Sequence, residues 1–280
     1  MIENCIYRYP LLETGILIKR YKRFFADIQL ASGELITAHC PNTGPMTGVS
    51  TLGSLVQVSR SDNPKRKLSY TWEMIQVNDN QPTWVGVNTG VPNRIIKLAL
   101  EQYLIPELAS YYSQIRCEVP YGKEQKSRVD FLLTNESAGI DSALSPQHGL
   151  RPLELTALLK ADALERSIYL EVKSVTLAEG KVALFPDTVT TRGQKHLREL
   201  MALLPRSRAV MLYFINRGDC THFAPCDRAD PVYGQLLREA VAKGVEVLPC
   251  RFEITPQEIR YLGLAEFLPM QPSAVKSIQN

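Results

Sequence analysis

The first third of the chain alternates apolar and polar residues over short segments, a pattern typical of half-buried β-strands. Two segments lie within residues 15–30, and others cover residues 34–39, 54–60, 70–77 and 84–87. Turn-forming residues separate them, as in the hairpin turn Ala31-Ser-Gly-Glu34. Five or six short strands in about 85 residues predict a small barrel, and an OB-like barrel fits the size.

The rest of the chain alternates helical periodicity with buried strands, which predicts an α/β domain. Helical spacing marks residues 93–104, 191–204 and 233–243, and strand-like runs cover residues 115–119, 128–133, 168–177, 209–215 and 245–251. We therefore expect an α/β (α+β overall) chain, with an OB-like barrel over residues 1–88 and an α/β domain over residues 89–280. Residues of about 135–167 separate two strand-like runs by far more than the roughly 2–5 residues of a hairpin loop, so we treat them as an insertion. The first half is loop-like, and residues 152–165, rich in Leu and Ala, could form a helix.

Composition places the chain among ordinary globular proteins, with 280 residues, 45% hydrophobic and 22% charged. No apolar run reaches the roughly 18 residues that a membrane helix needs. The N-terminus lacks the layout of a signal peptide. We therefore expect a cytoplasmic protein without a membrane partner. The six cysteines are scattered without a CxxC pair, which favours reduced structural thiols over zinc ligands or disulfides.

Positive charge is concentrated in two parts of the chain, although the net charge is only +3. Residues 16–68 hold eight Lys or Arg against three acids, and residues 192–208 hold five against one. Both concentrations are candidate phosphate-binding surfaces, while ordinary solvated surface is the alternative for any single cation. The candidate nucleic-acid-binding residues are Lys19, Arg20, Lys22, Arg23, Lys65, Arg66, Lys67 and Arg192.

Two predicted strands carry acids inside otherwise apolar runs, where an unpaired charge is costly. Asp130 lies within residues 127–133, and Glu171 lies two positions before Lys173 within residues 168–175. Strand side chains alternate faces, so Glu171 and Lys173 point the same way, and Asp130 joins them if the strands pair. Two interpretations are open from these residues alone: a buried ion pair that bridges two strands, and a metal-and-phosphate site.

The metal interpretation gives each of the three residues a chemical role. The carboxylate oxygens of Asp130 and Glu171 suit a hard divalent cation such as Mg²⁺ (or Mn²⁺). A cation held in this way polarises a phosphate and lowers the pKa of an attacking water. Lys173 would orient that water or stabilise the developing charge.

The helix predicted over residues 191–204 adds positive groups near this site. Thr190 or Thr191 can cap it, and its first turns present free N–H groups and a dipole that favour anions. These first turns contain Arg192, Gln194 and Lys195.

The order of helix, strand, Asp-bearing strand, Glu-x-Lys strand, helix and strand resembles the core of the PD-(D/E)xK nuclease superfamily. The resemblance implies that Asp130, Glu171 and Lys173 hold Mg²⁺ and assist the attack of water on a phosphodiester. It also implies a further polar pair on the next helix, at Gln194 and Lys195, and a mixed central sheet.

Several longer motifs are similar to those of the sugar fermentation stimulation protein A (SfsA) family, in the same order over about residues 10 to 255. They are His39-Cys-Pro-Asn-Thr-Gly44-Pro-Met-Thr-Gly48, Ser61-Asp-Asn-Pro-Lys-Arg-Lys67, Tyr70-Thr-Trp-Glu73, Val85-Gly-Val-Asn-Thr89, Phe185-Pro-Asp187, Arg192-Gly-Gln-Lys-His-Leu197, Phe223-Ala-Pro225 and Asp230-Pro-Val-Tyr-Gly234. The resemblance implies an OB-like barrel, a nuclease-like second domain and DNA binding without strong sequence preference. It also implies a link to the regulation of sugar (maltose) metabolism genes. The 135–167 segment is a departure, since most relatives have a much shorter one.

Two functions therefore follow as hypotheses from the sequence. In the first, the chain binds DNA through its phosphates and cleaves phosphodiester bonds with Mg²⁺. In the second, it is a non-catalytic DNA-binding transcriptional regulator whose acid and lysine site is vestigial. No helix-turn-helix and no sugar pocket is recognisable, and the oligomeric state is left open.

Overall fold

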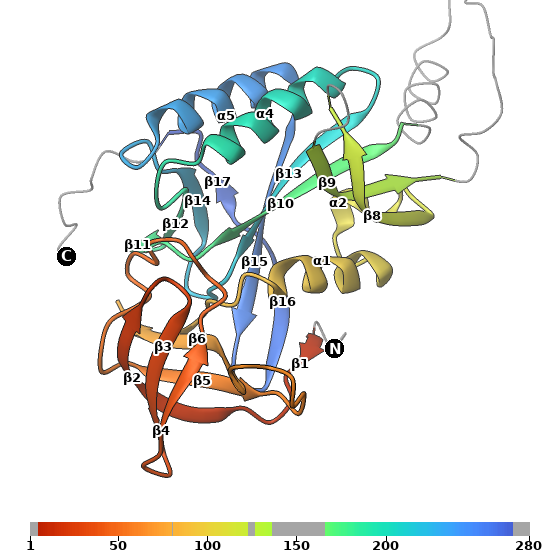
Figure 1. Ribbon diagram of the computed structural model, residues 1–280. Helices are drawn as coiled ribbons and strands as arrows, with labels where there is room; N and C mark the ends of the chain where they lie inside the picture. Colours follow the sequence, from red (N-terminus) through yellow and green to blue (C-terminus); the bar gives the residue numbers. More distant parts are fainter. Residues whose placement is uncertain (1–4, 80, 123–126, 136–165, 271–280) are drawn as a thin grey trace, which may run out of the picture.

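The computed structural model describes residues 5–79, 81–122, 127–135 and 166–270, which form a barrel packed against a larger sheet domain (Figure 1). The insertion expected at about residues 135–167 lies outside the described residues except at its ends. Within the described part of the chain, no helix is long and apolar enough to cross a membrane. This part includes all six cysteines, and none of them forms a disulfide.

The N-terminal barrel closes through a pairing between strands that are not neighbours in sequence. Its strands are β2 (Glu13–Tyr21), β3 (Phe25–Leu30), β4 (Leu35–His39), β5 (Leu55–Arg60), β6 (Tyr70–Asn78) and β7 (Pro82–Gly86). They follow the order β4-β3-β2-β5-β6-β7, and β4 also pairs with β6 in parallel, which closes five strands into a ring. Trp72 lies fully buried inside it and donates its indole N–H to the Met74 carbonyl at 3.0 Å. The predicted OB-like barrel is confirmed.

The second domain is built on a seven-stranded mixed sheet, as predicted. Strands β10, β13 and β15 are parallel, and the outer strands pair antiparallel, in the order β1-β16-β15-β13-β10-β9-β8. The strands are β1 (Cys5–Arg8), β8 (Gln114–Tyr121), β9 (Ser127–Thr134), β10 (Ile168–Val175), β13 (Arg208–Ile215), β15 (Glu246–Ile254) and β16 (Glu258–Leu264).

Helices cover both faces of this sheet, which explains why β13 is a continuous apolar run. On one face, α1 (Val91–Glu101) and α2 (Pro106–Ala109) share a core with Leu212. On the other face, α4 (Thr191–Leu203) and α5 (Pro231–Lys243) share a core with Tyr213 (Figure 1). Because neighbouring strand residues face opposite ways, β13 presents even-numbered residues to α1 and odd-numbered ones to α4 and α5.

Some short elements carry too little periodicity to be predicted from sequence. They are α2, β1, and a small four-stranded sheet of β11 (Ala178–Glu179), β12 (Val182–Phe185), β14 (His222–Pro225) and β17 (Glu266–Phe267). Residues 5–8 fall in the range expected for the barrel, yet β1 pairs with β16 in the large sheet. This placement covers an edge of that sheet, which would otherwise expose unpaired backbone groups. The domain boundary between residues 88 and 89 stays a prediction.

A buried arginine ties the barrel to the second domain. Arg217, after β13, is 2% exposed and contacts Asp79 Oδ2 at the end of β6 at 2.7 Å. Asp219 holds the same guanidinium through two hydrogen bonds of 2.7 Å. The backbone also joins the domains, since the Gly86 N–H donates to the Asn216 carbonyl at 3.0 Å. These contacts fix how the barrel sits against the sheet.

Candidate metal and phosphate site

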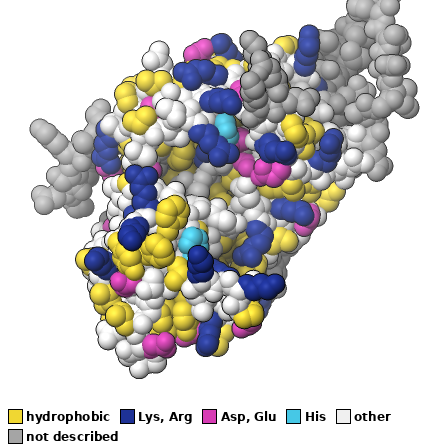
Figure 2. Space-filling model, in the orientation of Figure 1, with side chains coloured by type: hydrophobic (Ala, Val, Ile, Leu, Met, Phe, Trp, Pro, Cys, Tyr) yellow, Lys and Arg dark blue, Asp and Glu magenta, His cyan; other side chains and the backbone are white. Residues whose placement is uncertain are grey.

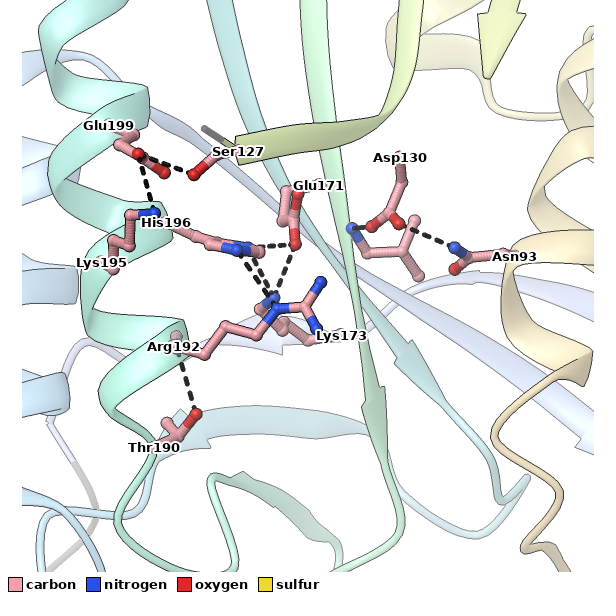
Figure 3. A network of polar contacts seen from close by, with 12 residues as sticks. Asn93, Ser127, Asp130, Glu171, Lys173, Thr190, Arg192, Lys195, His196 and Glu199 are labelled. Carbon is pink, nitrogen blue, oxygen red and sulfur yellow. Dashed lines mark hydrogen bonds and ion pairs between the residues drawn. The ribbon is translucent and has the colours of Figure 1, made fainter. Parts of the chain in front are cut away.

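Asp130 lies where two strands of the sheet part. The pairing of β9 with β10 ends at Phe131 opposite Leu170, although β9 stays paired with β8 as far as Ser127. The Asp130 carboxylate takes over the next backbone donor, because its Oδ2 accepts from the Val172 N–H at 2.7 Å. Its Oδ1 accepts from the Asn93 amide of α1 at 2.8 Å (Figure 3).

Glu171 and Lys173 lie on the face of β10 that α4 covers, as the alternation of strand side chains predicts. Lys173 Nζ donates to Glu171 Oε1 at 2.8 Å, and their side chains are 13% and 3% exposed. The structure therefore brings together the three residues that we expected, Asp130, Glu171 and Lys173. We call these three residues the acid site.

His196 on α4 completes the contacts of Glu171. Its Nδ1 lies in very short contact with Glu171 Oε1 and 3.2 Å from Lys173 Nζ. An unprotonated ring nitrogen would repel the carboxylate, so Nδ1 carries the proton and donates it. Arg192 Nε, which can only donate, points at Nε2 at 3.4 Å. The contacts with Glu171 and Arg192 favour the tautomer with its proton on Nδ1, in which Nε2 faces the Arg192 guanidinium.

The two carboxyls of the acid site differ in their affinity for protons. Burial and the neighbouring Glu171 charge raise the pKa of Asp130 to about 6, despite the hydrogen bond from Val172. Burial also opposes the ionisation of Glu171, but the hydrogen bonds from His196 and Lys173 and the positive charge of Lys173 outweigh it and lower the pKa of this carboxyl. The Glu171 carboxyl is thus firmly ionised at neutral pH, whereas ionisation of Asp130 in the folded protein costs free energy.

The oxygen atoms of the acid site fit a divalent cation. Glu171 Oε2 is buried and finds no hydrogen-bond partner among the described residues. A buried carboxylate oxygen is costly to leave unsatisfied, and a hard cation would satisfy it. In the described ranges, no three His, Cys, Asp or Glu side chains converge on one point. Asp130 and Glu171 would therefore hold the cation with water or phosphate oxygens as the remaining ligands.

The start of α4 is built as the sequence suggests, but two of its residues point elsewhere. Thr190 caps the helix by accepting from the Gly193 N–H at 3.1 Å. Gln194 donates its amide to both Asp230 oxygens at 3.0 and 3.1 Å, which holds α4 to the start of α5. Lys195 is half exposed and lies 3.6 Å from Glu199 Oε1. A catalytic role for Gln194 or Lys195 stays a prediction.

The cations predicted on the barrel gather on one of its rims. The end of β2, the end of β4 and the start of β6 meet there, since Phe25 pairs with His39 and Ala38 pairs with Tyr70. We call the following residues the basic rim: Lys19, Arg20, Lys22, Arg23, Lys65, Arg66 and Lys67. All are exposed except Arg20, whose guanidinium donates to the carbonyls of Asn42 and Gly44 at 2.9 and 2.8 Å.

The basic rim lies beside the second domain, close to the start of α1 and α4. Thr89, two residues before α1, donates its hydroxyl at 3.1 Å to the Pro41 carbonyl, which is next to the Asn42 carbonyl that Arg20 of the rim contacts. Lys and Arg side chains border the hollow between the barrel and the helices on both sides (Figure 2). Contacts through Asn42, through Pro41 with Thr89, and through Asn93 thus connect the basic rim to the neighbourhood of the acid site.

Four residues of the site make contacts that the sequence alone did not predict. His196 and Arg192 lie four positions apart on α4, and this spacing is the signal that could have paired them. Asn93 and Ser127 gave no signal, because their partners lie 37 and 72 positions away in the chain. Ser127 donates to Glu199 Oε1 at 2.8 Å (Figure 3).

Comparison with known families assigns both halves of the chain. Residues 90–258 match the model described as the sugar fermentation stimulation protein RE domain, and residues 18–87 match the SfsA N-terminal OB domain. The chain belongs to the SfsA family. This confirms the resemblance that the sequence motifs indicated.

Relatives from cyanobacteria cover nearly the whole chain. The sugar fermentation stimulation protein homolog of Trichormus variabilis is 65% identical over 94% of this chain and 98% of its own length. That of Nostoc punctiforme is 66% identical over 93% of this chain and 97% of its own length. Among solved structures, Pyrococcus furiosus SfsA in complex with Ca²⁺ superposes with a TM-score of 0.75 at 22% identity, over 94% of this chain and 99% of that one. This likeness supports the fold of barrel and sheet domain.

Proposed function

We propose that this protein binds DNA through the phosphate backbone, with low sequence specificity, and hydrolyses phosphodiester bonds at the acid site with Mg²⁺ (or Mn²⁺). The observation that carries the proposal is the unpartnered, buried Oε2 of Glu171 beside Asp130 and Lys173. Leaving a buried carboxylate oxygen without a partner costs free energy, and a divalent cation shared with Asp130 would remove that cost.

The chain's own residues divide the work of such a reaction. Bound Mg²⁺ would supply Lewis-acid polarisation of the phosphate and a water of lowered pKa. Asp130 and Glu171 would hold that cation, and Asn93 and the Val172 N–H fix the Asp130 carboxylate. Lys173, placed by Glu171 at 2.8 Å, would orient the attacking water or stabilise the developing negative charge.

His196 positions Glu171 rather than touching substrate. Its Nδ1–H occupies Oε1, which turns Oε2 toward the partner that the described residues do not provide. Partners that orient a metal ligand in this way are worth about 10–100-fold in metal affinity or activity. His196 therefore acts through Glu171.

The basic rim and two helix starts would bind the DNA backbone. Asn93 in the first turn of α1 contacts Asp130, and Arg192 in the first turn of α4 contacts His196, so both helices begin beside the acid site. Helix N-termini favour phosphate, and exposed cations supply affinity without base readout. The Pyrococcus relative was solved with Ca²⁺, which is in keeping with a divalent cation at this family's fold.

The alternative is a DNA-binding regulator of sugar (maltose) metabolism genes in which the acid site is vestigial. The name of the relatives, sugar fermentation stimulation protein homolog, favours it. Cleavage of single- and double-stranded DNA and of RNA, with Mg²⁺ or Mn²⁺, by wild type and Glu171→Gln separates the two. Metal-dependent cleavage lost in Glu171→Gln supports the nuclease. Salt-dependent DNA binding without cleavage by either protein supports the regulator.

A further inference from the structure

A small cavity between the barrel and the second domain collects three of the sequence motifs that the acid site does not use. It has a volume of about 100 Å³ and opens beside the start of α1 and α4. Asn42 of the His39–Gly48 motif, Thr89 of the Val85–Thr89 motif and Asp187 of the Phe185–Asp187 motif line it. Segments far apart in sequence and from both domains thus meet at one point.

The polar side chains of this cavity have hydrogen-bonding capacity left over. Asn42 Oδ1 accepts from the Gly44 N–H at 2.9 Å, and no described residue accepts from its Nδ2. Ser174 Oγ accepts from the Asn216 amide at 2.9 Å, which leaves its own proton to donate. Thr89 donates its proton to the barrel and keeps two lone pairs as acceptors.

Asp187 is the charged side chain of the cavity lining, and its carboxylate disfavours a negatively charged occupant. Its Oδ2 lies close to the Gly44 backbone, 3.8 Å from where a Cβ would be. Burial raises the pKa of this carboxyl, against the opposing effect of nearby backbone N–H groups. No Lys or Arg lines the cavity, so a phosphate or carboxylate would be repelled. The remaining walls are Thr176 and four apolar residues, namely Val175, Leu177, Leu184 and Phe185.

The size and chemistry of the cavity match a single nucleobase. An amide, three hydroxyl residues and a carboxylate beside apolar walls are suited to the donors and acceptors along a base edge and to its flat faces. A carboxylate accepts readily from an exocyclic amine such as N4 of cytosine. The volume is too small for a dinucleotide cofactor or a sugar chain, whose pockets run to several hundred Å³.

The position of the cavity relates it to the acid site. Ser174 directly follows Lys173 on β10, and Thr89 precedes Asn93 by four residues. The side chains of Lys173 and Ser174 face opposite ways. The cavity and the acid site nevertheless share β10 and the approach to α1, so a base one nucleotide away from a phosphate at Lys173 would reach across the strand end to the cavity. This position of the base depends on the phosphodiester site proposed above.

We propose that this interdomain cavity holds one unpaired nucleobase bearing an exocyclic amine, from a DNA strand whose phosphate lies at the acid site. The pocket makes a single-stranded or locally opened strand the preferred substrate form, because a paired base cannot leave its stack without an unpairing cost. Sequence readout at this position is limited to the class of base.

An abasic scan of a short strand tests the cavity without requiring cleavage. Eight-nucleotide cytosine strands, each with one abasic site at a different position, are titrated with the full chain in EDTA. We expect one position at which loss of the base weakens binding roughly tenfold, the scale of one well-held base. Equal affinity at every position, with the intact strand still bound in a salt-dependent way, would overturn the cavity and leave the proposed phosphate binding standing.

Two near-isosteric variants assign the effect to the cavity. Asn42→Asp keeps the Oδ1 acceptor for the Gly44 N–H and removes the Nδ2 donor, and Asp187→Asn removes the carboxylate charge. Both should flatten the abasic scan, whereas Lys243→Ala on the outer face of α5 should not. A scan unchanged in both variants would overturn the assignment.

A second measurement covers the case in which the intact strand does not bind at all. Saturation-transfer NMR with deoxycytidine and thymidine should give a stronger signal for deoxycytidine, lost in Asp187→Asn. No signal from either nucleoside would overturn the proposal whatever the outcome for phosphate binding.

Discussion

The basic rim and the acid site carry opposite charges, and they are built in opposite ways. Six of the seven rim cations are exposed and rest on short loops or strand ends. The Glu171 carboxylate is 3% exposed and is held by two charged or polar partners. An exposed cation makes weak, replaceable contacts, whereas a buried acid depends on each neighbour. Single substitutions should therefore be tolerated in the rim and should be severe in the acid site.

Substitution of Glu171 should give the largest effect. In Glu171→Gln the side chain keeps its shape but loses the charge that a cation and Lys173 both require. We expect metal-dependent cleavage to fall about a thousandfold or more, since metal-based charge stabilisation is worth several kcal/mol. Single-turnover cleavage measures this. Glu239→Gln on the exposed face of α5 serves as the matched control, and an equal loss in both variants would speak against the assignment.

His196 should give an intermediate effect that depends on the replacement. His196→Asn keeps a side-chain N–H near Glu171 Oε1, whereas His196→Leu removes it. We expect Mn²⁺ affinity to fall about 10–100-fold in His196→Leu and to recover in part in His196→Asn. If His196 had a purely structural role, the two variants would lose the same amount of Mn²⁺ affinity whenever their stabilities were equal.

The tautomer of His196 can be observed without any metal. In ¹⁵N-histidine-labelled protein, Nδ1 should be protonated and Nε2 free, and Arg192→Ala should weaken this preference. A resonance from Nε2–H in wild type would contradict the positioning role.

The rim should respond in proportion to the number of cations removed. Lys65→Ala with Lys67→Ala leaves the Arg66 hydrogen bond to Thr71 intact, so the fold is spared. We expect DNA affinity to fall up to roughly tenfold and the salt slope to drop by about 2, one for each phosphate contact. Lys243→Ala with Arg260→Ala removes the same charge from other surfaces. A salt slope that falls equally in both pairs would mean that the rim has no special part in binding.

The raised pKa of Asp130 should make the folding stability depend on pH. Its folded pKa of about 6 exceeds the ordinary value of 3.8, so the folded state binds the proton more tightly than the unfolded chain between these pH values. The contribution of this group to stability is therefore full below about pH 4 and is lost as pH rises through 6. Without metal, Asp130→Asn should unfold at similar denaturant concentrations at pH 4 and be about 1–3 kcal/mol more stable than wild type at pH 7. Denaturant titrations at both pH values measure this, and a destabilised variant at pH 7 would contradict it.

Gln194 should give the smallest effect. Its amide lies on Asp230 rather than in the acid site, so Gln194→Ala should cost about 1 kcal/mol of stability and leave the cleavage rate per folded molecule nearly unchanged. Thermal unfolding measures the effect on stability, and cleavage rates measured well below the midpoint of thermal unfolding measure the effect on catalysis. A rate loss of a hundredfold at full folding would restore the catalytic role that the sequence suggests.

The sequence was informative where a local pattern reports on a local structure. Alternation gave the barrel strands, helical spacing gave α4, and the Glu171-x-Lys173 step gave the shared face of β10. It was silent where the partner lies far away in the chain. No periodicity connects residues 5–8 to β16, and none links Asn93 to Asp130, because tertiary packing alone creates these contacts. Gln194 shows the reverse case, in which a polar residue at a suggestive position is used to join two helices.

The most direct test of the central claim is a crystal of the full chain soaked in Mn²⁺ and measured at the manganese absorption edge. We expect one anomalous peak within coordination distance of Glu171 Oε2 and an Asp130 oxygen, absent in Glu171→Gln. A well-ordered site with no manganese at Glu171 Oε2, or manganese bound equally in the variant, would contradict it.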